Sequence, residues 1–168
     1  EADRGRPVIG VRHALPLLLL TGCLYTTYVA QAAHGELELL GNARPIGDVV
    51  RDPDTPLRTA MLLAEIPAIR DYGRSYGLTI TRNYRNYTDL GRRPATVWFV
   101  GAADPLQFRP IPWCFPIAGC FPGLGWFEED DAVAFKQALD AKGYDAIVRA
   151  AGAFSTGGWF PDPVEIGR

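Results

Sequence analysis

The amino-acid sequence predicts an α+β fold, in which a transmembrane or signal-anchor helix and a helical segment precede a small mixed sheet with one packed helix. Residues 95–102, 124–127 and 144–151 are apolar runs of strand length. Residues 128–142 start with acidic side chains and carry an apolar face, which predicts a helix. The order strand, strand, helix, strand favours a helix packed on one face of a sheet.

The chain divides into three segments on this interpretation. Residues 1–33 are a basic flank followed by a membrane anchor or lipoprotein signal. Residues 34–77 are helical, and residues 78–168 form the small α+β domain.

The amino-terminal segment has the charge pattern of a membrane anchor. Arg4, Arg6 and Arg12 precede Ala14–Ala33, a run without formal charge. A helix of that length spans roughly 30 Å, the thickness of the hydrocarbon core. The arginines place the amino terminus in the cytoplasm, so we expect an inner-membrane anchor with the bulk of the chain in the periplasm.

Three interpretations of this segment remain open. Leu20-Thr21-Gly22-Cys23 is similar to a bacterial lipobox, which makes Cys23 a candidate for lipidation after removal of residues 1–22. A retained single-pass helix over 8–33 is the second interpretation, and its small and hydroxyl side chains suit packing against other helices. A buried core helix is the third. The first two predict membrane lipid as a partner.

The helical segment contains one long predicted helix over residues 56–76. Asp54 and Pro56 suit its start, and Gly77 suits its end. Pro67 should kink this helix or split it at Ile66. The spacing of the apolar residues predicts that one face packs inward: Leu62, Ile66, Ile69 and Tyr76.

Charge and composition argue against nucleic-acid binding. The formal net charge is −2, and the alternation of arginine and tyrosine over 82–87 is short. We interpret residues 78–93 as a solvated loop or edge strand. Residues 107–117 should form a second strand, which its prolines confine to an edge. In the helix that begins with the acidic run 128–131, the residues expected to face inward are Ala132, Phe135 and Leu139.

Two of the three cysteines lie in the segment 113–120. Pro116 and Gly119 allow this segment to turn back on itself, so Cys114 and Cys120 are candidates for a disulfide in an oxidising compartment. Two buried thiols or a partial metal site are the alternatives. Near the other end of the chain, Trp159 and Phe160 follow a glycine-rich turn and are candidates for partner contact.

Five blocks of the sequence together resemble the bacterial putative aminopeptidase family: residues 28–40, 43–46, 113–120, 143–145 and 155–163. The Trp-Cys-Phe-Pro-x-Ala-Gly-Cys block is the most specific of them. The resemblance implies ancestry with membrane-associated or lipoprotein zinc peptidases. Such proteins carry a His-Glu-x-x-His motif, in which the histidines bind zinc and the glutamate is the general base.

This sequence lacks that motif. Its two histidines are His13 and His34, and neither belongs to a His-Glu-x-x-His pattern. It also lacks a phosphate-binding loop and a Gly-x-Ser-x-Gly elbow, and Ser155 has no identifiable histidine partner. We therefore expect no catalytic, metal-binding or cofactor-binding residue in this chain.

The first functional hypothesis is a non-catalytic, membrane-anchored, periplasm-facing accessory subunit of a larger membrane protein complex. It predicts integral-membrane protein partners. The alternative is the amino-terminal part of a membrane-associated zinc aminopeptidase whose catalytic half is absent from this chain.

Overall fold

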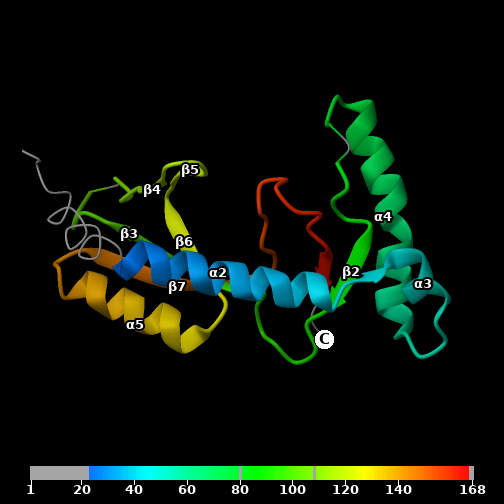
Figure 1. The fold of residues 1–168 in the computed structure, drawn as a ribbon, viewed down its shortest axis with the longest axis horizontal. Coiled ribbons are helices and arrows are strands. Elements are labelled where there is room, and N and C mark those ends of the chain that lie inside the picture. Colours follow the sequence, from blue (N-terminus) through cyan, green and yellow to red (C-terminus); the bar gives the residue numbers. More distant parts are fainter. Residues whose placement is uncertain (1–22, 80, 108, 167–168) are drawn as a thin grey trace, which may run out of the picture.

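The computed structural model describes residues 23–79, 81–107 and 109–166 and has the expected α+β architecture. The elements in chain order are α2 (Cys23–Gly41), β1 (Arg44–Pro45), α3 (Ile46–Arg51), α4 (Leu57–Ser75), β2 (Asn86–Asp89), β3 (Val97–Ala103), β4 (Trp113–Phe115), β5 (Gly119–Phe121), β6 (Gly123–Trp126), α5 (Glu129–Asp140), β7 (Asp145–Ala151) and β8 (Val164–Ile166). Figure 1 shows two groups of elements that α2 connects along its length.

The first group is the antiparallel sheet β6-β3-β7 with α5 packed on it. Val100 in the central strand β3 is fully buried. The predicted inward face of α5 is confirmed, because Ala132 and Leu139 are buried and Phe135 packs against the same cluster. Alternating apolar residues on short strands and one apolar stripe on the helix explain this arrangement.

Among the described residues of 107–117, which exclude 108, the expected second strand is reduced to Trp113–Phe115 and an isolated bridge between Pro110 and Ala103. Trp113–Phe115 pairs with β5 in a separate two-stranded ribbon. The prolines at 110, 112 and 116 lack backbone N–H donors, which explains why a longer ladder does not form here.

Helix α2 packs on the first sheet through specific contacts. The Gln31 side chain donates to the Gly125 carbonyl at 3.1 Å and accepts from the Phe127 amide at 3.2 Å. The Tyr28 ring lies against Trp126, with centroids 5.6 Å apart. Part of the expected membrane anchor is therefore docked on β6, whereas residues 1–22 lie outside the described part of the chain. Among the described residues, none of the helices combines the length and the hydrophobicity that a membrane span requires.

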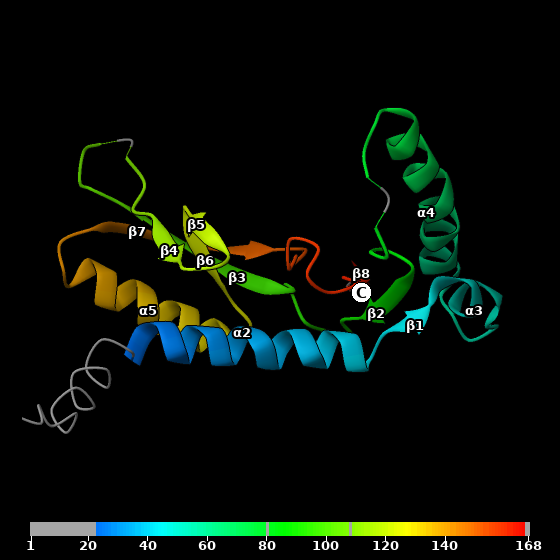
Figure 2. The same ribbon diagram turned by 45° about the horizontal axis from the view of Figure 1, so that its top comes forward.

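The second group contains the sheet β1-β2-β8 and the helices α3 and α4. Strands β2 and β8 are parallel, with Tyr87 opposite Val164. The Thr88 hydroxyl of β2 donates to the Leu39 carbonyl of α2 at 2.8 Å, so α2 contacts both groups. In Figure 2, α4 stands away from the rest of the molecule above α3.

The prediction of which side of α4 packs inward is wrong. Leu63 is fully buried and Ile66 packs beside it, but Leu62, Ile69 and Tyr76 are exposed. The helix has apolar residues on two sides, and the sequence spacing favoured the side that faces solvent. Pro67 lies inside the helix and does not divide it.

Candidate functional site

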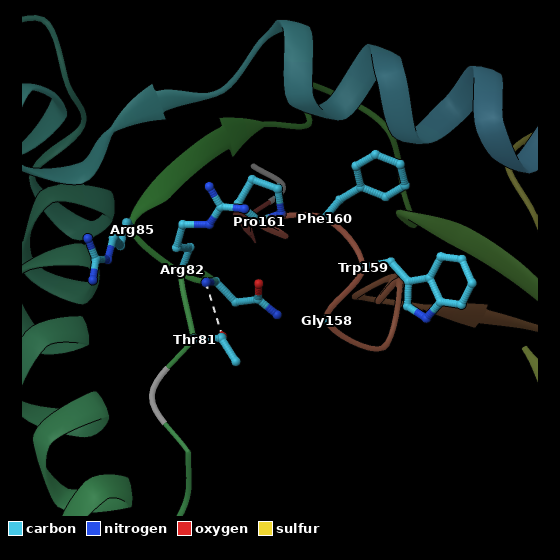
Figure 3. Close-up of a pocket in the computed structure, with 8 residues that line it drawn as sticks. Thr81, Arg82, Arg85, Gly158, Trp159, Phe160 and Pro161 are labelled. Carbon is cyan, nitrogen blue, oxygen red and sulfur yellow. Dashed lines mark hydrogen bonds between the residues drawn. The ribbon is translucent and has the colours of Figure 1, made fainter.

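A pocket of about 330 Å³ opens between two loops that are far apart in the sequence. One wall is lined by Thr81, Arg82, Asn83 and Arg85, and the other by residues 158–161. Figure 3 shows Arg82 extending toward Pro161, while Trp159 and Phe160 extend away from Arg82. The pocket therefore has one basic wall and one wall of glycine and aromatic residues.

Asp162 fixes the loop that forms the second wall. Its carboxylate accepts hydrogen bonds from the Ser155 hydroxyl at 2.8 Å, the Thr156 hydroxyl at 2.6 Å and the Asn83 amide at 3.3 Å. The residue is 1% exposed. The Asp162 carboxylate thus joins residues 155–156 to the first wall.

The backbone conformation of Tyr84 sets the course of the segment that forms the first wall. Its φ of 60° is in the left-handed region, which aromatic residues rarely occupy. The Tyr84 amide donates to the Asp162 carbonyl at 2.8 Å, which holds this conformation. After this turn, Arg85 extends away from Pro161 toward α4 (Figure 3). One short segment thus supplies arginines to two separate surfaces.

A buried carboxyl cluster lies behind the loop. Glu36 of α2 is 5% exposed, and burial together with the charges of Asp162 and Glu165 raises its pKa from 4.5 to about 7. Burial also raises the pKa of Glu165, and the nearby Thr96 hydroxyl and Phe154 amide offset part of that rise. The cluster can therefore take up a proton near neutral pH.

Three buried oxygens in this region have no hydrogen-bond partner in the described part of the chain: Glu36 Oε1, Thr96 Oγ1 and Glu165 Oε1. The Thr96 hydroxyl thus lies near Glu165 without the geometry of a hydrogen bond. Among the described residues, no group of three or more His, Cys, Asp or Glu side chains is arranged to hold a metal ion.

A second hollow, of about 630 Å³, lies between α3 and α4. Its lining combines apolar side chains with arginines, including Arg85 from the segment that also borders the first pocket. We call this hollow the arginine groove.

The predicted cysteine pair forms a disulfide in the structure. Cys114 and Cys120 are directly opposite each other in the β4–β5 ribbon, and their sulfurs are 2.05 Å apart. Trp113 beside this bond is buried in the main core, so the ribbon is attached to the first sheet. The side chain of Cys23, the lipidation candidate, lies outside the described residues.

The predicted partner-contact residues are exposed. Trp159 is 63% exposed and Phe160 is 48% exposed. Aromatic side chains at such exposure are available to a partner, and the contact itself stays a prediction.

Sequence reasoning missed the carboxyl cluster and the arginine groove. Glu36 gave one usable signal, because it lies three residues before Leu39 and therefore on the same helix face as a core residue. No comparable signal marks the groove, since its arginines come from α3, α4 and the segment after α4.

The fold and these surfaces define a small α+β protein whose hollows are built mainly from loops and helix faces. Residues 27–166 match the putative aminopeptidase family, and the chain therefore belongs to this family. No curated protein and no solved structure matches the chain.

Proposed function

We propose that this member of the aminopeptidase family is a non-catalytic docking module, held at the periplasmic side of the inner membrane as an accessory subunit of a larger membrane protein complex. The partner is an integral-membrane protein subunit. The module contributes binding surface, and bond cleavage is not part of its role.

The observation that carries this proposal is the unpartnered apolar side of α4. Large apolar side chains on the side of α4 away from α3 are exposed: Leu57, Met61, Leu62, Ile69, Tyr72 and Tyr76. Exposed apolar side chains gathered on one side of a helix are typical of a protein–protein contact. Trp159 and Phe160 add a second exposed aromatic surface.

Two features support the location. The basic flank before the uncharged run 14–33 has the charge asymmetry of an inner-membrane anchor. The disulfide between Cys114 and Cys120 suits an oxidising compartment such as the periplasm.

The test is co-purification from detergent-extracted membranes, followed by cross-linking and mass spectrometry. We expect a stoichiometric complex with an integral-membrane protein and cross-links from α4. Met61→Glu and Tyr72→Glu should each release the chain from this complex without changing its thermal unfolding, because both side chains are exposed. Recovery of the wild-type chain only as a monomer would contradict the proposal.

The second candidate is the amino-terminal part of a membrane-associated zinc aminopeptidase. The family match over residues 27–166 favours it. Because the catalytic half of such an enzyme is absent from this chain, the reading frame of the gene separates the two functions. A frame that continues past Arg168 into a His-Glu-x-x-His segment would favour the enzyme, whereas a stop codon after Arg168 would favour the docking module.

A further inference from the structure

The arginine groove has the chemistry of a site for an acidic, apolar peptide. We infer that it docks an acidic, leucine-containing segment of the partner protein. This inference rests on the proposed docking function and names the kind of segment that the module binds.

The floor of the groove is apolar. Ile46 and Val50 of α3 face Leu63 and Ile66 of α4, and the four side chains belong to one packed cluster. Leu63 is fully buried, so the accessible apolar surface of the floor includes the partly buried Val50 and Ile66. A leucine or similar side chain placed here would lose apolar surface to the floor, which favours binding.

The rim of the groove is strongly basic. Arg51, Arg70, Arg74 and Arg85 line it, whereas Asp71 is the one acidic residue in the same lining. Arg70 and Arg74 lie one helical turn apart, so they present two guanidinium groups in a row. Guanidinium groups bind carboxylates through paired hydrogen bonds. Several separate carboxylates on one ligand fit this rim better than a single anionic group.

Arg85 and Arg74 are the rim arginines most available to a ligand, whereas Arg51 donates to the Gly47 carbonyl at 2.8 Å and pairs with Asp48 at 3.0 Å. The Arg85 side chain forms no hydrogen bond or ion pair within the part of the chain that the structure describes, and Arg70 donates to the Thr81 carbonyl at 3.0 Å. Arg74 pairs with Asp71, but the two side chains are 63% and 67% exposed. Exposed pairs of this kind contribute little free energy, so a ligand carboxylate can replace Asp71.

The concave shape favours a protein segment over a membrane surface. The apolar floor lies between two helices, and a flat bilayer cannot reach it while α3 and α4 stand on either side. An extended or helical segment can place its apolar side chains on the floor and its carboxylates at the rim.

The experiment measures fluorescence anisotropy of a fluorescein-labelled peptide that repeats Glu-Leu-Leu-Glu, with the purified 168-residue chain. The peptide ends are acetylated and amidated, so that only side chains carry charge. We expect saturable binding that salt weakens and that a glutamine-for-glutamate peptide lacks. Arg85→Glu and Arg74→Gln should each weaken binding about tenfold.

Arg149→Glu is the matched control, because Arg149 is exposed on β7 outside the groove. It should bind the acidic peptide like the wild type. Circular dichroism shows that each variant is folded before binding is measured. Equal binding of the glutamine peptide, or unchanged binding by both groove variants, would overturn the inference.

Binding to phosphatidylglycerol vesicles tests the alternative that the groove binds lipid. Binding to these vesicles that Arg85→Glu abolishes, with no binding to the peptide, would assign the groove to lipid and overturn the inference. The purified chain reports on the groove alone, so a negative peptide result leaves the co-purification result for the proposed function unaffected.

Discussion

At the scale of single residues, Asp162 has the largest structural role among the polar side chains of the candidate site. Its carboxylate holds both Ser155 and Thr156 and reaches Asn83 across the pocket. Removing it leaves several donors without an acceptor in a buried setting, which costs more than the hydrogen bonds themselves contribute.

Asp162→Ala should therefore lower the free energy of unfolding by about 3 kcal/mol. Urea unfolding followed by tryptophan fluorescence measures this change. Asp71→Asn is the control, because it removes an exposed ion pair and should change stability by less than about 1 kcal/mol. A similar effect of the two variants would show that Asp162 does not hold the loop.

Glu36 makes stability depend on pH. Its folded-state pKa of about 7 lies above the ordinary 4.5, so the native state binds more protons than the unfolded state between these values. The free energy of unfolding should fall as pH rises from about 4.5 to about 7, and Glu36 adds no further change above that range. The raised pKa of Glu165 acts in the same direction.

Glu36→Gln should reduce this slope, because glutamine keeps the shape of the side chain without a titrating group. Thermal unfolding at a series of pH values between these limits measures it. Glu65→Gln on α4 changes an exposed glutamate and should leave the slope as in the wild type. An unchanged slope in Glu36→Gln would assign the pH dependence to other groups.

At the scale of elements, glycine positions determine how closely α2 approaches the sheet. A Cβ atom at Gly35 would overlap the ring of Phe127. At Gly41 on the same helix, a Cβ atom would meet nothing within 4 Å. The close approach at Gly35 lets α2 lie against the residues that follow β6.

Gly35→Ala should destabilise the protein by about 2 kcal/mol, because the overlap exceeds the gain in helix propensity. Gly41→Ala is the matched control and should be neutral or slightly stabilising. Thermal unfolding of both variants checks the difference. Equal unfolding temperatures would mean that Phe127 moves aside without cost.

The β4–β5 ribbon depends on its disulfide. The bond closes a short loop with a sequence separation of 6, and the ribbon has only a few ladder residues. Cys114→Ser with Cys120→Ser should lower the free energy of unfolding by about 2 kcal/mol. Denaturant unfolding measures this, and thiol labelling of the oxidised wild type should modify neither cysteine. Labelling of both would contradict the disulfide.

At the scale of the whole molecule, the two groups of elements have separate cores. Val100 and Leu124 belong to the core under the first sheet, whereas Val49 and Leu63 belong to the core between α3, α4 and β2. Helix α2 and the segment from 155 to 166 connect the groups (Figure 1). A core change in one group should therefore act mainly on that group.

Leu63→Ala tests this separation. It should cost about 3 kcal/mol in the stability of the second group, because Leu63 is fully buried. Hydrogen exchange should become faster in α3 and α4 and stay unchanged in β3 and β7. Leu62→Ala, on the exposed side of the same helix, is the control and should have little effect. Uniformly faster exchange would show that the molecule unfolds as one unit.

Local sequence patterns predicted the elements that composition and periodicity mark along the chain. The helix α5 follows from its acidic start, its apolar stripe and Gly143, whose φ of 86° suits the residue after a helix end. The strands β3 and β7 follow from their apolar composition. The strands were predictable from composition although their partners are distant, since β3 pairs with β6 and β7.

Contacts between distant residues decided the rest. The buried side of α4, the parallel pairing of β2 with β8, and the cluster of Glu36 with Asp162 and Glu165 depend on which segments meet in space. Apolar periodicity could not distinguish the two apolar sides of α4, because burial depends on where α3 lies. The α+β class, the family blocks and the close cysteine pair could be predicted from the amino-acid sequence. The positions of the charged and exposed apolar surfaces follow from the tertiary contacts, because those surfaces join residues that are far apart along the chain.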